Sequence, residues 1–244
     1  MSRLPPEFAY LEGKVLSGRV YPEFFTMDPS WRVYNAGFGD GPQPIVYRRQ
    51  FAAMVGVDIQ GDRLARAGRL MAAVGITNVS LQTGNVEATG LPDASFDAAL
   101  AIDIIEHVQQ PETFLRETWR VLKPGGKLLI TFPAMHDRFE DAMSALGRVF
   151  KPWKKRAPHG DAWHPDHHAH EHPVNVWKKM VEQAGFVEQA SRATTLFPPL
   201  HLYGVPRVWF KWGWLHAMDR RLASSPKLQN YGQTVMVIYE KPRP

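Results

Sequence analysis

The chain has 244 residues, of which 44% are hydrophobic and 22% charged, so it is long and apolar enough to bury a core. It contains no cysteine, which excludes disulfides, thiolate metal sites and a cysteine nucleophile. The net charge of +5 is compatible with acidic substrates, nucleic acid or an anionic membrane surface, and does not distinguish among them. We find no apolar run of about 18 residues and no apolar stretch typical of a signal peptide, so the expected location is the cytoplasm.

Between residues 31 and 133, short β-rich runs alternate with helical patterns, which is typical of a parallel sheet covered by helices. The predicted segments in this half are, in chain order, strand Trp31–Ala36, helix Pro44–Met54, strand Val55–Ile59, helix Arg63–Val74, strand Val79–Thr83, strand Asp97–Ile102, helix Pro111–Leu122 and strand Lys127–Phe132. Proline favours the first turn of two of these helices, and the turn Lys123-Pro124-Gly125-Gly126 ends the third.

The composition changes after Pro133. Residues 134–172 contain the basic, aromatic run Phe150–Arg156 and six histidines between His159 and His172. The pattern then predicts helix Val174–Ala184 and strands at Phe186–Leu196 and Thr234–Glu240. Residues 198–232 form a long insertion before the last strand and carry Trp209, Trp212 and Trp214.

Glycines at alternating positions, Gly37, Gly39 and Gly41, follow the first predicted strand. Glycine lets a chain turn tightly and approach a ligand closely, although such turns also occur without a ligand. Asp58 ends the second strand, where a carboxylate can accept hydrogen bonds from both ribose hydroxyls or can cap the following helix. The order strand, glycines, helix, strand and acid favours a nucleoside ligand.

Four further motifs follow in sequence: Gly84–Glu87, Leu91–Asp97, Asp103–Val108 and Arg120–Gly126. Together with the glycines, they resemble the class I S-adenosylmethionine-dependent methyltransferases, a superfamily with many small-molecule methylating enzymes. The resemblance covers residues 31–133 and implies an α/β, Rossmann-like fold. Its seven-stranded, mostly parallel sheet would have helices on both faces, here with a helical insertion before the last strand. A Rossmann dehydrogenase fits less well, because its glycines follow a G-x-G-x-x-G spacing.

The resemblance implies S-adenosyl-L-methionine as the cofactor and assigns residues to its parts. Gly37, Gly39 and Gly41 would lie under the methionine and ribose, and Asp58 would hold the ribose hydroxyls. Ile59 would pack on the adenine, whose edge would meet Asn85 and Val86. Asp103 would lie near the sulfonium, at the end of the fourth strand.

Two positions depart from the superfamily, which usually has an acidic residue at Asn35 and commonly an aspartate at Asn85. Asparagine still accepts a hydrogen bond but brings no negative charge, so cofactor affinity is expected to fall by about 1–2 kcal/mol. The alternative to a methyltransferase is therefore a catalytically degenerate cofactor-binding or scaffold protein of the same fold.

Asp103 and His107 are the candidate catalytic residues, although Glu106-His107 can also be read as the start of the next helical segment. The string Asp103-x-x-Glu106-His107 further resembles an element of ubiquinone-pathway O-methyltransferases and of small-RNA 3′-end methyltransferases. Some of these bind Mg²⁺ with a further histidine after the fifth strand, a region that here contains His164, His167, His168, His170 and His172. Mg²⁺ prefers oxygen ligands, which argues against a site made of histidines alone. The use of a metal therefore stays open.

Residues 206–221 mix large aromatic side chains with cations. The favoured interpretation is a helical lid that packs on the sheet or lines the acceptor pocket. The alternative is an interfacial helix with its tryptophans at the depth of the lipid headgroups. The cations that would then contact lipid phosphates are Arg207, Lys211, Arg220 and Arg221. The absence of a recognisable RNA-binding module disfavours nucleic acid as a partner.

We therefore expect a single domain, residues 1–244. Residues 1–30 would form an N-terminal lid, residues 31–133 the cofactor-binding core, and residues 134–244 a variable acceptor-side half. The acceptor would be a small molecule, a glycan or a lipid-linked compound. Peripheral membrane contact and the oligomeric state stay open.

Overall fold

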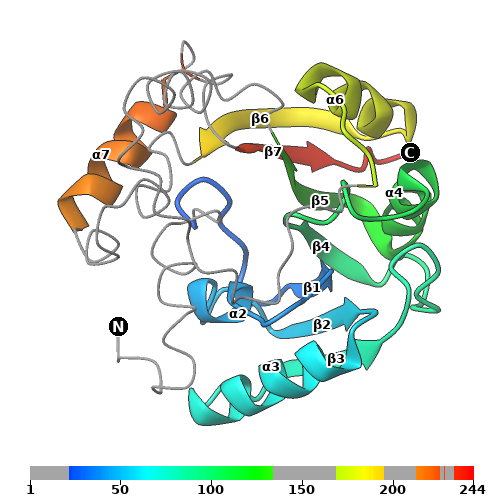
Figure 1. The fold of residues 1–244 in the computed structure, drawn as a ribbon. Helices are drawn as coiled ribbons and strands as arrows, with labels where there is room; N and C mark the ends of the chain where they lie inside the picture. Colours follow the sequence, from blue (N-terminus) through cyan, green and yellow to red (C-terminus); the bar gives the residue numbers. More distant parts are fainter. Residues whose placement is uncertain (1–21, 134–168, 195–212, 226–227, 229–233) are drawn as a thin grey trace, which may run out of the picture.

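The computed structural model describes residues 22–133, 169–194, 213–225, 228 and 234–244, and Figure 1 shows their arrangement. Seven strands form one sheet in the order β3-β2-β1-β4-β5-β7-β6. The strands are β1 (Arg32–Ala36), β2 (Ala53–Asp58), β3 (Val79–Thr83), β4 (Phe96–Ala101), β5 (Leu122–Pro133), β6 (Val187–Thr194) and β7 (Thr234–Glu240). The helices are α2 (Gln43–Val46), α3 (Gly61–Ala73), α4 (Pro111–Val121), α6 (Val174–Gln183) and α7 (Gly213–Ala223).

The sheet is mostly parallel, as predicted. Strands β1 to β5 pair in parallel, and β7 runs antiparallel between β5 and β6. After β1 the chain moves outward through β2 and β3 and then returns to β4 on the other side of β1. The carboxyl ends of β1 and β4 therefore flank a topological switch point, which is where open α/β sheets bind their ligands.

Side chains alternate between the two faces of the sheet along β1. Val33 packs in one apolar cluster and its neighbour Tyr34 in the other. Helices α4 and α6 cover the Tyr34 face through the fully buried Phe114 and Trp177, whereas α3 covers the opposite face through Leu64. The two clusters confirm the predicted helices on both faces of the sheet, and Figure 1 shows α3 well separated from α4 and α6.

The predicted helix Pro44–Met54 is wrong in its extent. Helix α2 ends at Val46, Arg49 has a left-handed φ of 74°, and Ala53 and Met54 already belong to β2. The left-handed residue interrupts helical hydrogen bonding. Met54 instead pairs with Val79 of β3 and is buried in the core. Tertiary pairing thus overrides the local helical pattern at this position.

The turn Lys123–Gly126 lies inside β5 rather than before it. Phe96 of β4 pairs with Leu122 and Ala98 with Lys127, so the register shifts across the turn. Gly125 takes a left-handed φ of 81°, and Nζ of Lys123 contacts Oδ1 of Asp97 at 2.6 Å. The predicted strand Lys127–Phe132 is confirmed as the part of β5 beyond this irregularity.

Several predictions concern residues outside the described ranges. They include most of the N-terminal lid, the basic run Phe150–Arg156, and Trp209 and Trp212. Helix α7 confirms a helix within the predicted insertion. No helix within the described ranges is long and apolar enough to cross a membrane. The single-domain organisation and the cytoplasmic location stay predictions.

Candidate functional site

The three alternating glycines all adopt left-handed backbone conformations, with φ of 64° at Gly37, 56° at Gly39 and 73° at Gly41. Space is also limited around them. A Cβ at Gly37 would lie 2.6 Å from Cδ1 of Ile104, and one at Gly41 would lie 2.6 Å from Cε1 of Phe38. Both the conformation and the crowding require glycine, so the motif forms a bare backbone loop at the carboxyl end of β1.

Asp58 fastens this loop to the end of β2. Its Oδ2 accepts a hydrogen bond of 2.8 Å from the amide of Gly39, and its Oδ1 accepts one of 2.9 Å from the amide of Gln60. The residue at the N-cap of α3 is Gln60, so Asp58 does not hold the capping position. A carboxylate has about four lone-pair positions, and these two bonds leave acceptor capacity on each oxygen for ligand hydroxyls.

Ile59 follows Asp58 and is 71% exposed, the highest value among the exposed large hydrophobic side chains in the described ranges. It therefore offers an apolar surface directly beside the carboxylate. This is consistent with its predicted contact to a flat apolar group such as adenine, and that contact stays a prediction.

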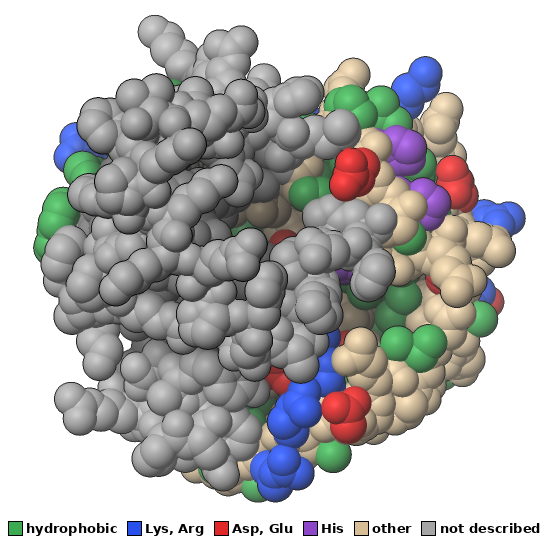
Figure 2. Space-filling view, viewed as in Figure 1, with side chains coloured by type: hydrophobic (Ala, Val, Ile, Leu, Met, Phe, Trp, Pro, Cys, Tyr) green, Lys and Arg blue, Asp and Glu red, His purple; other side chains and the backbone are tan. Residues whose placement is uncertain are grey.

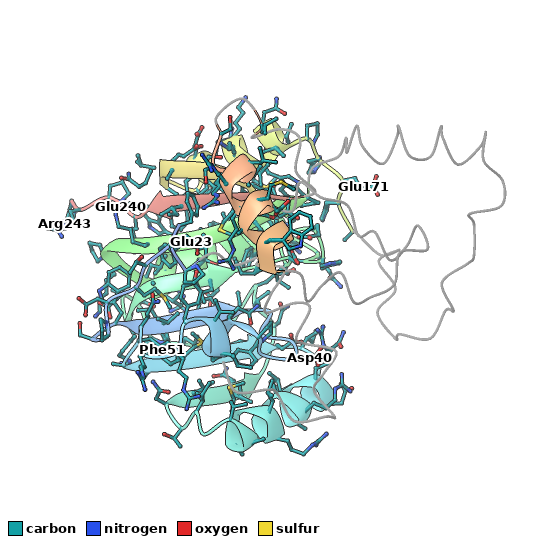
Figure 3. All side chains as sticks on the ribbon, turned by 90° about the vertical axis from the view of Figure 1, so that its left-hand side faces the viewer. Glu23, Asp40, Phe51, Glu171, Glu240 and Arg243 are labelled. Atoms are coloured by element: carbon teal, nitrogen blue, oxygen red, sulfur yellow. The ribbon has the colours of Figure 1, made fainter. Side chains whose placement is uncertain are left out.

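Arg63 also lies at the glycine loop, and sequence reasoning missed it. Its Nη2 is 2.7 Å from the position that a Cβ of Gly39 would take and 3.3 Å from Oδ2 of Asp40. Arg66, one turn further along α3, reaches Oδ1 of Asp40 at 3.5 Å. The signal was available as two arginines at i, i+3 on one helix face, but such pairs are common on solvated helices. The labelled Asp40 lies toward one end of the strands in Figure 3, with Phe51, Glu240 and Arg243 toward the other.

Asn35 lies in β1, two residues before Gly37, and is fully buried. Its Nδ2 is 3.4 Å from Oε1 of Gln43 and 3.8 Å from the sulfur of Met54, while its Oδ1 is buried without a hydrogen-bond partner. The predicted role of Asn35 in cofactor binding stays a prediction. Its side-chain contacts connect β1 to α2 and to β2.

Asn85 and Val86 occupy the turn after β3 and differ in environment. Asn85 is exposed, and its Oδ1 accepts a hydrogen bond of 2.9 Å from the amide of Glu87. Val86 is buried in the apolar core. The carboxylate of Glu87 then accepts bonds of 2.7 and 3.1 Å from the amides of Gln109 and Gln110, just before α4. This turn is therefore connected to the segment that follows β4.

Asp103 follows β4 and has a left-handed φ of 50°, which is uncommon for a residue with a side chain. Its amide donates to Oγ1 of Thr131 at 2.8 Å, and the Thr131 hydroxyl donates back to Oδ1 of Asp103 at 3.2 Å. Because Ala36 of β1 pairs with Ala101 of β4, Gly37 and Asp103 emerge close together at the switch point. Strained residues of this kind concentrate at functional sites.

Glu106 and His107 do not start a helix, so that interpretation was wrong. They lie in a turn in which the amide of His107 donates to the carbonyl of Ile104 at 2.9 Å, and α4 begins only at Pro111. Pro111 favours the first turn of α4, and the Glu87 carboxylate accepts hydrogen bonds from the two amides before it, so α4 begins at Pro111. Nε2 of His107 lies 4.0 Å from Oε1 of the buried Glu106, within the segment that also holds Asp103.

His170 joins this segment from beyond β5. Its amide donates to the carbonyl of Glu106 at 3.2 Å, and its ring Nε2 is 3.1 Å from the carbonyl of Gln109. His164, His167 and His168 lie outside the described ranges. Within those ranges, no group of three histidines or carboxylates is arranged to hold a metal ion.

A family profile described as a methyltransferase domain matches residues 34–130. A ubiquinone/menaquinone C-methyltransferase of Methylobacterium nodulans is 34% identical over 49% of this chain and 45% of its own length. The ajmaline N-methyltransferase of Rauvolfia serpentina is 37% identical over 41% of this chain and 33% of its own length. The chain therefore spans less than half the length of these relatives.

The fold is similar to solved structures over nearly its whole length. The YcgJ protein of Bacillus subtilis gives a TM-score of 0.59 at 18% identity, covering 96% of this chain and 99% of that one. A geranyl diphosphate methyltransferase in complex with S-adenosylmethionine gives 0.59 at 14% identity, covering 96% and 86%. At these identities the likeness concerns the fold.

Proposed function

Because residues 34–130 belong to the class I S-adenosylmethionine-dependent methyltransferase superfamily, we propose that this protein transfers a methyl group from S-adenosylmethionine to an acceptor. S-adenosylmethionine is the cofactor of that superfamily. The relatives are named as N-, C- and O-methyltransferases, so they leave the acceptor atom open. We take the acceptor to be a small molecule, a glycan or a lipid-linked compound.

One observation carries the proposal, namely the hydrogen bond between Gly39 and Asp58 at the switch point of the sheet. It places a bare backbone loop and a carboxylate side by side. A ribose with two hydroxyls fits the remaining acceptor positions of Asp58, and the glycines leave room for the chain of a methionine above the backbone. The exposed Ile59 would then face the adenine, with Asn85 and Val86 at its edge.

Residues after β4 would face the reacting end of the cofactor, which supplies an electrophilic methyl group when bound. Thr131 holds the Asp103 carboxylate in position through its hydroxyl. A carboxylate there would stabilise positive charge on the neighbouring groups. His107, in the same segment, would accept the proton that an oxygen or nitrogen acceptor loses. Most of the rate would come from holding the acceptor in line with the methyl group.

The second candidate is a protein of the same fold that binds the cofactor without turning it over. The buried, uncharged Asn35 favours it, because its side-chain amide contacts Gln43 and Met54 within the described part of the chain. Calorimetry with S-adenosylhomocysteine measures binding by itself, and a screen of acceptors with methyl-labelled cofactor measures transfer. Binding with transfer supports the enzyme, binding without transfer across the acceptor classes supports the second candidate, and preferential binding of NAD contradicts both.

A further inference from the structure

Helix α7 exposes three large apolar side chains to the outside. Of its side chains that the structure describes, Trp214, Met218 and Leu222 are 63%, 39% and 40% exposed, whereas Asp219 and Ala223 are buried. The three exposed residues recur every fourth position and so form one stripe along the helix. A surface helix of a globular protein normally shows the reverse pattern.

This stripe is concentrated rather than scattered. The exposed large hydrophobic side chains within the described ranges number six, and three of them lie on this one helix. Ala217 and Arg221 share the same exposed side, so the stripe carries a cation and, among the described side chains, no carboxylate. Figure 2 shows hydrophobic and basic side chains together at the left-hand rim, where α7 lies in Figure 1. Exposed apolar patches of this kind mark interaction surfaces.

The helix is held in place from its inner side. Arg192 of β6 donates to the backbone carbonyl of Arg220, and the guanidinium of Arg220 lies 3.7 Å from Oε1 of Glu23. Figure 3 shows α7 in front of the strands with Glu23 nearby. Because β6 runs parallel to β5, Arg192 lies near the carboxyl edge of the sheet, which is also the edge of the glycine loop. The stripe therefore faces outward from a helix fixed beside the candidate site.

We propose that the exposed stripe of α7 docks the protein on an anionic lipid surface. Tryptophan, methionine and leucine side chains would enter the boundary between headgroups and acyl chains, and Arg221 would meet lipid phosphates. The net charge of +5 adds a long-range attraction to such a surface. A second copy of the chain is the less favourable occupant, because it would bring together two Arg221 side chains and two net positive charges.

Docking would present the candidate site to compounds held in the membrane. A lipid-linked acceptor would then reach the carboxyl edge of the sheet without leaving its bilayer. This last step depends on the proposed methyl transfer, whereas lipid binding does not. A measurement of lipid binding alone therefore separates the two proposals.

The test is co-sedimentation of the full chain with vesicles of phosphatidylcholine, with or without phosphatidylglycerol. We expect binding to the anionic vesicles that weakens as salt rises, and little binding to pure phosphatidylcholine. The double variant Met218→Ser/Leu222→Ser should bind about tenfold more weakly, since its apolar contact is reduced. Val176→Ser on α6, where the valine is 38% exposed, is the matched control and should bind as the parent does.

Charge is tested separately by Arg221→Glu, with the exposed Lys179→Glu on α6 as a control of the same charge change. Arg221→Glu should weaken anionic binding more than Lys179→Glu. The proposal is overturned if the parent does not bind anionic vesicles, or if the α7 variants bind as well as their controls. It is also overturned if light scattering shows a dimer that the α7 variants abolish, because the occupant would then be a second copy. Circular dichroism confirms that every variant is folded.

Discussion

The amide of Gly39 donates a 2.8 Å hydrogen bond to the carboxylate of Asp58, which connects the loop after β1 to the end of β2. The second oxygen of the same carboxylate is bonded to the amide of Gln60, so the backbone of both segments sets its orientation. A group oriented in advance loses less entropy when a ligand binds. The predictions for the cofactor site follow from this arrangement.

Asp58→Ala should weaken the binding of S-adenosylhomocysteine at least about tenfold, because charged hydrogen bonds to hydroxyls contribute about 1.5–3 kcal/mol. Isothermal titration calorimetry measures the change. Asp62→Ala is the matched control, since Asp62 lies nearby in the first turn of α3 with its side chain 74% exposed. Equal affinities in the two variants would show that the ribose is held elsewhere.

Gly39→Ala should abolish cofactor binding in a folded protein. The left-handed φ of 56° costs a substituted residue about 1 kcal/mol, and the new Cβ would lie 2.7 Å from the guanidinium of Arg63. Gly90→Ala is the control for the backbone cost alone, because Gly90 has a similar φ of 68° with no atom within 4 Å of its added Cβ. We expect similar losses of stability and a loss of binding only at Gly39. Normal binding by Gly39→Ala would make the loop purely structural.

Arg63→Ala should change which form of the cofactor is preferred. The sulfonium of S-adenosylmethionine carries a positive charge that the thioether of S-adenosylhomocysteine lacks. Removing a guanidinium beside the loop should therefore improve the affinity for S-adenosylmethionine relative to S-adenosylhomocysteine, by about twofold to tenfold. Arg66→Ala, which removes the other partner of Asp40, is the control and should leave the ratio unchanged. A shifted ratio in both variants would assign the effect to Asp40 instead.

Glu117 should contribute to stability only above acidic pH. Hydrogen bonds from Arg120, together with those from Thr89, lower the pKa of Glu117 from its ordinary 4.5 to about 2. The stabilisation is therefore present above pH 4.5 and disappears as the pH falls toward 2. Glu117→Gln should lose about 1.5–3 kcal/mol of unfolding free energy at neutral pH.

Urea denaturation at several pH values tests this linkage. The difference between the parent and Glu117→Gln should shrink as the solution is acidified. Glu112→Gln, at an exposed position in the first turn of the same helix, should be nearly neutral throughout. A difference that stays constant down to acidic pH would mean that Glu117 acts through packing rather than through its charge.

Local patterns in the sequence were sufficient for much of the fold. Strands β3 and β7 were predicted with their exact bounds, and β1, β2, β4, β6, α3, α4 and α6 to within a few residues, whereas β5 begins at Leu122 instead of the predicted Lys127. Alternation, helical periodicity and turn residues act over a few positions and are visible in a single sequence. The glycines and Asp58 could be identified for the same reason, because the glycine motif begins directly after β1 and Asp58 ends β2.

Tertiary structure alone decided which of these residues meet. Gly39 and Asp58 are 19 positions apart, and Asp103 and Thr131 are 28 apart, so their contacts depend on strand order and register. Register also shortened the helix predicted at Pro44–Met54, since Met54 is required in β2. The place of Arg63 at the loop and the outward-facing stripe of α7 follow from how helices are set against the sheet. A periodic pattern states that a helix has an apolar side, but only packing decides whether that side is buried.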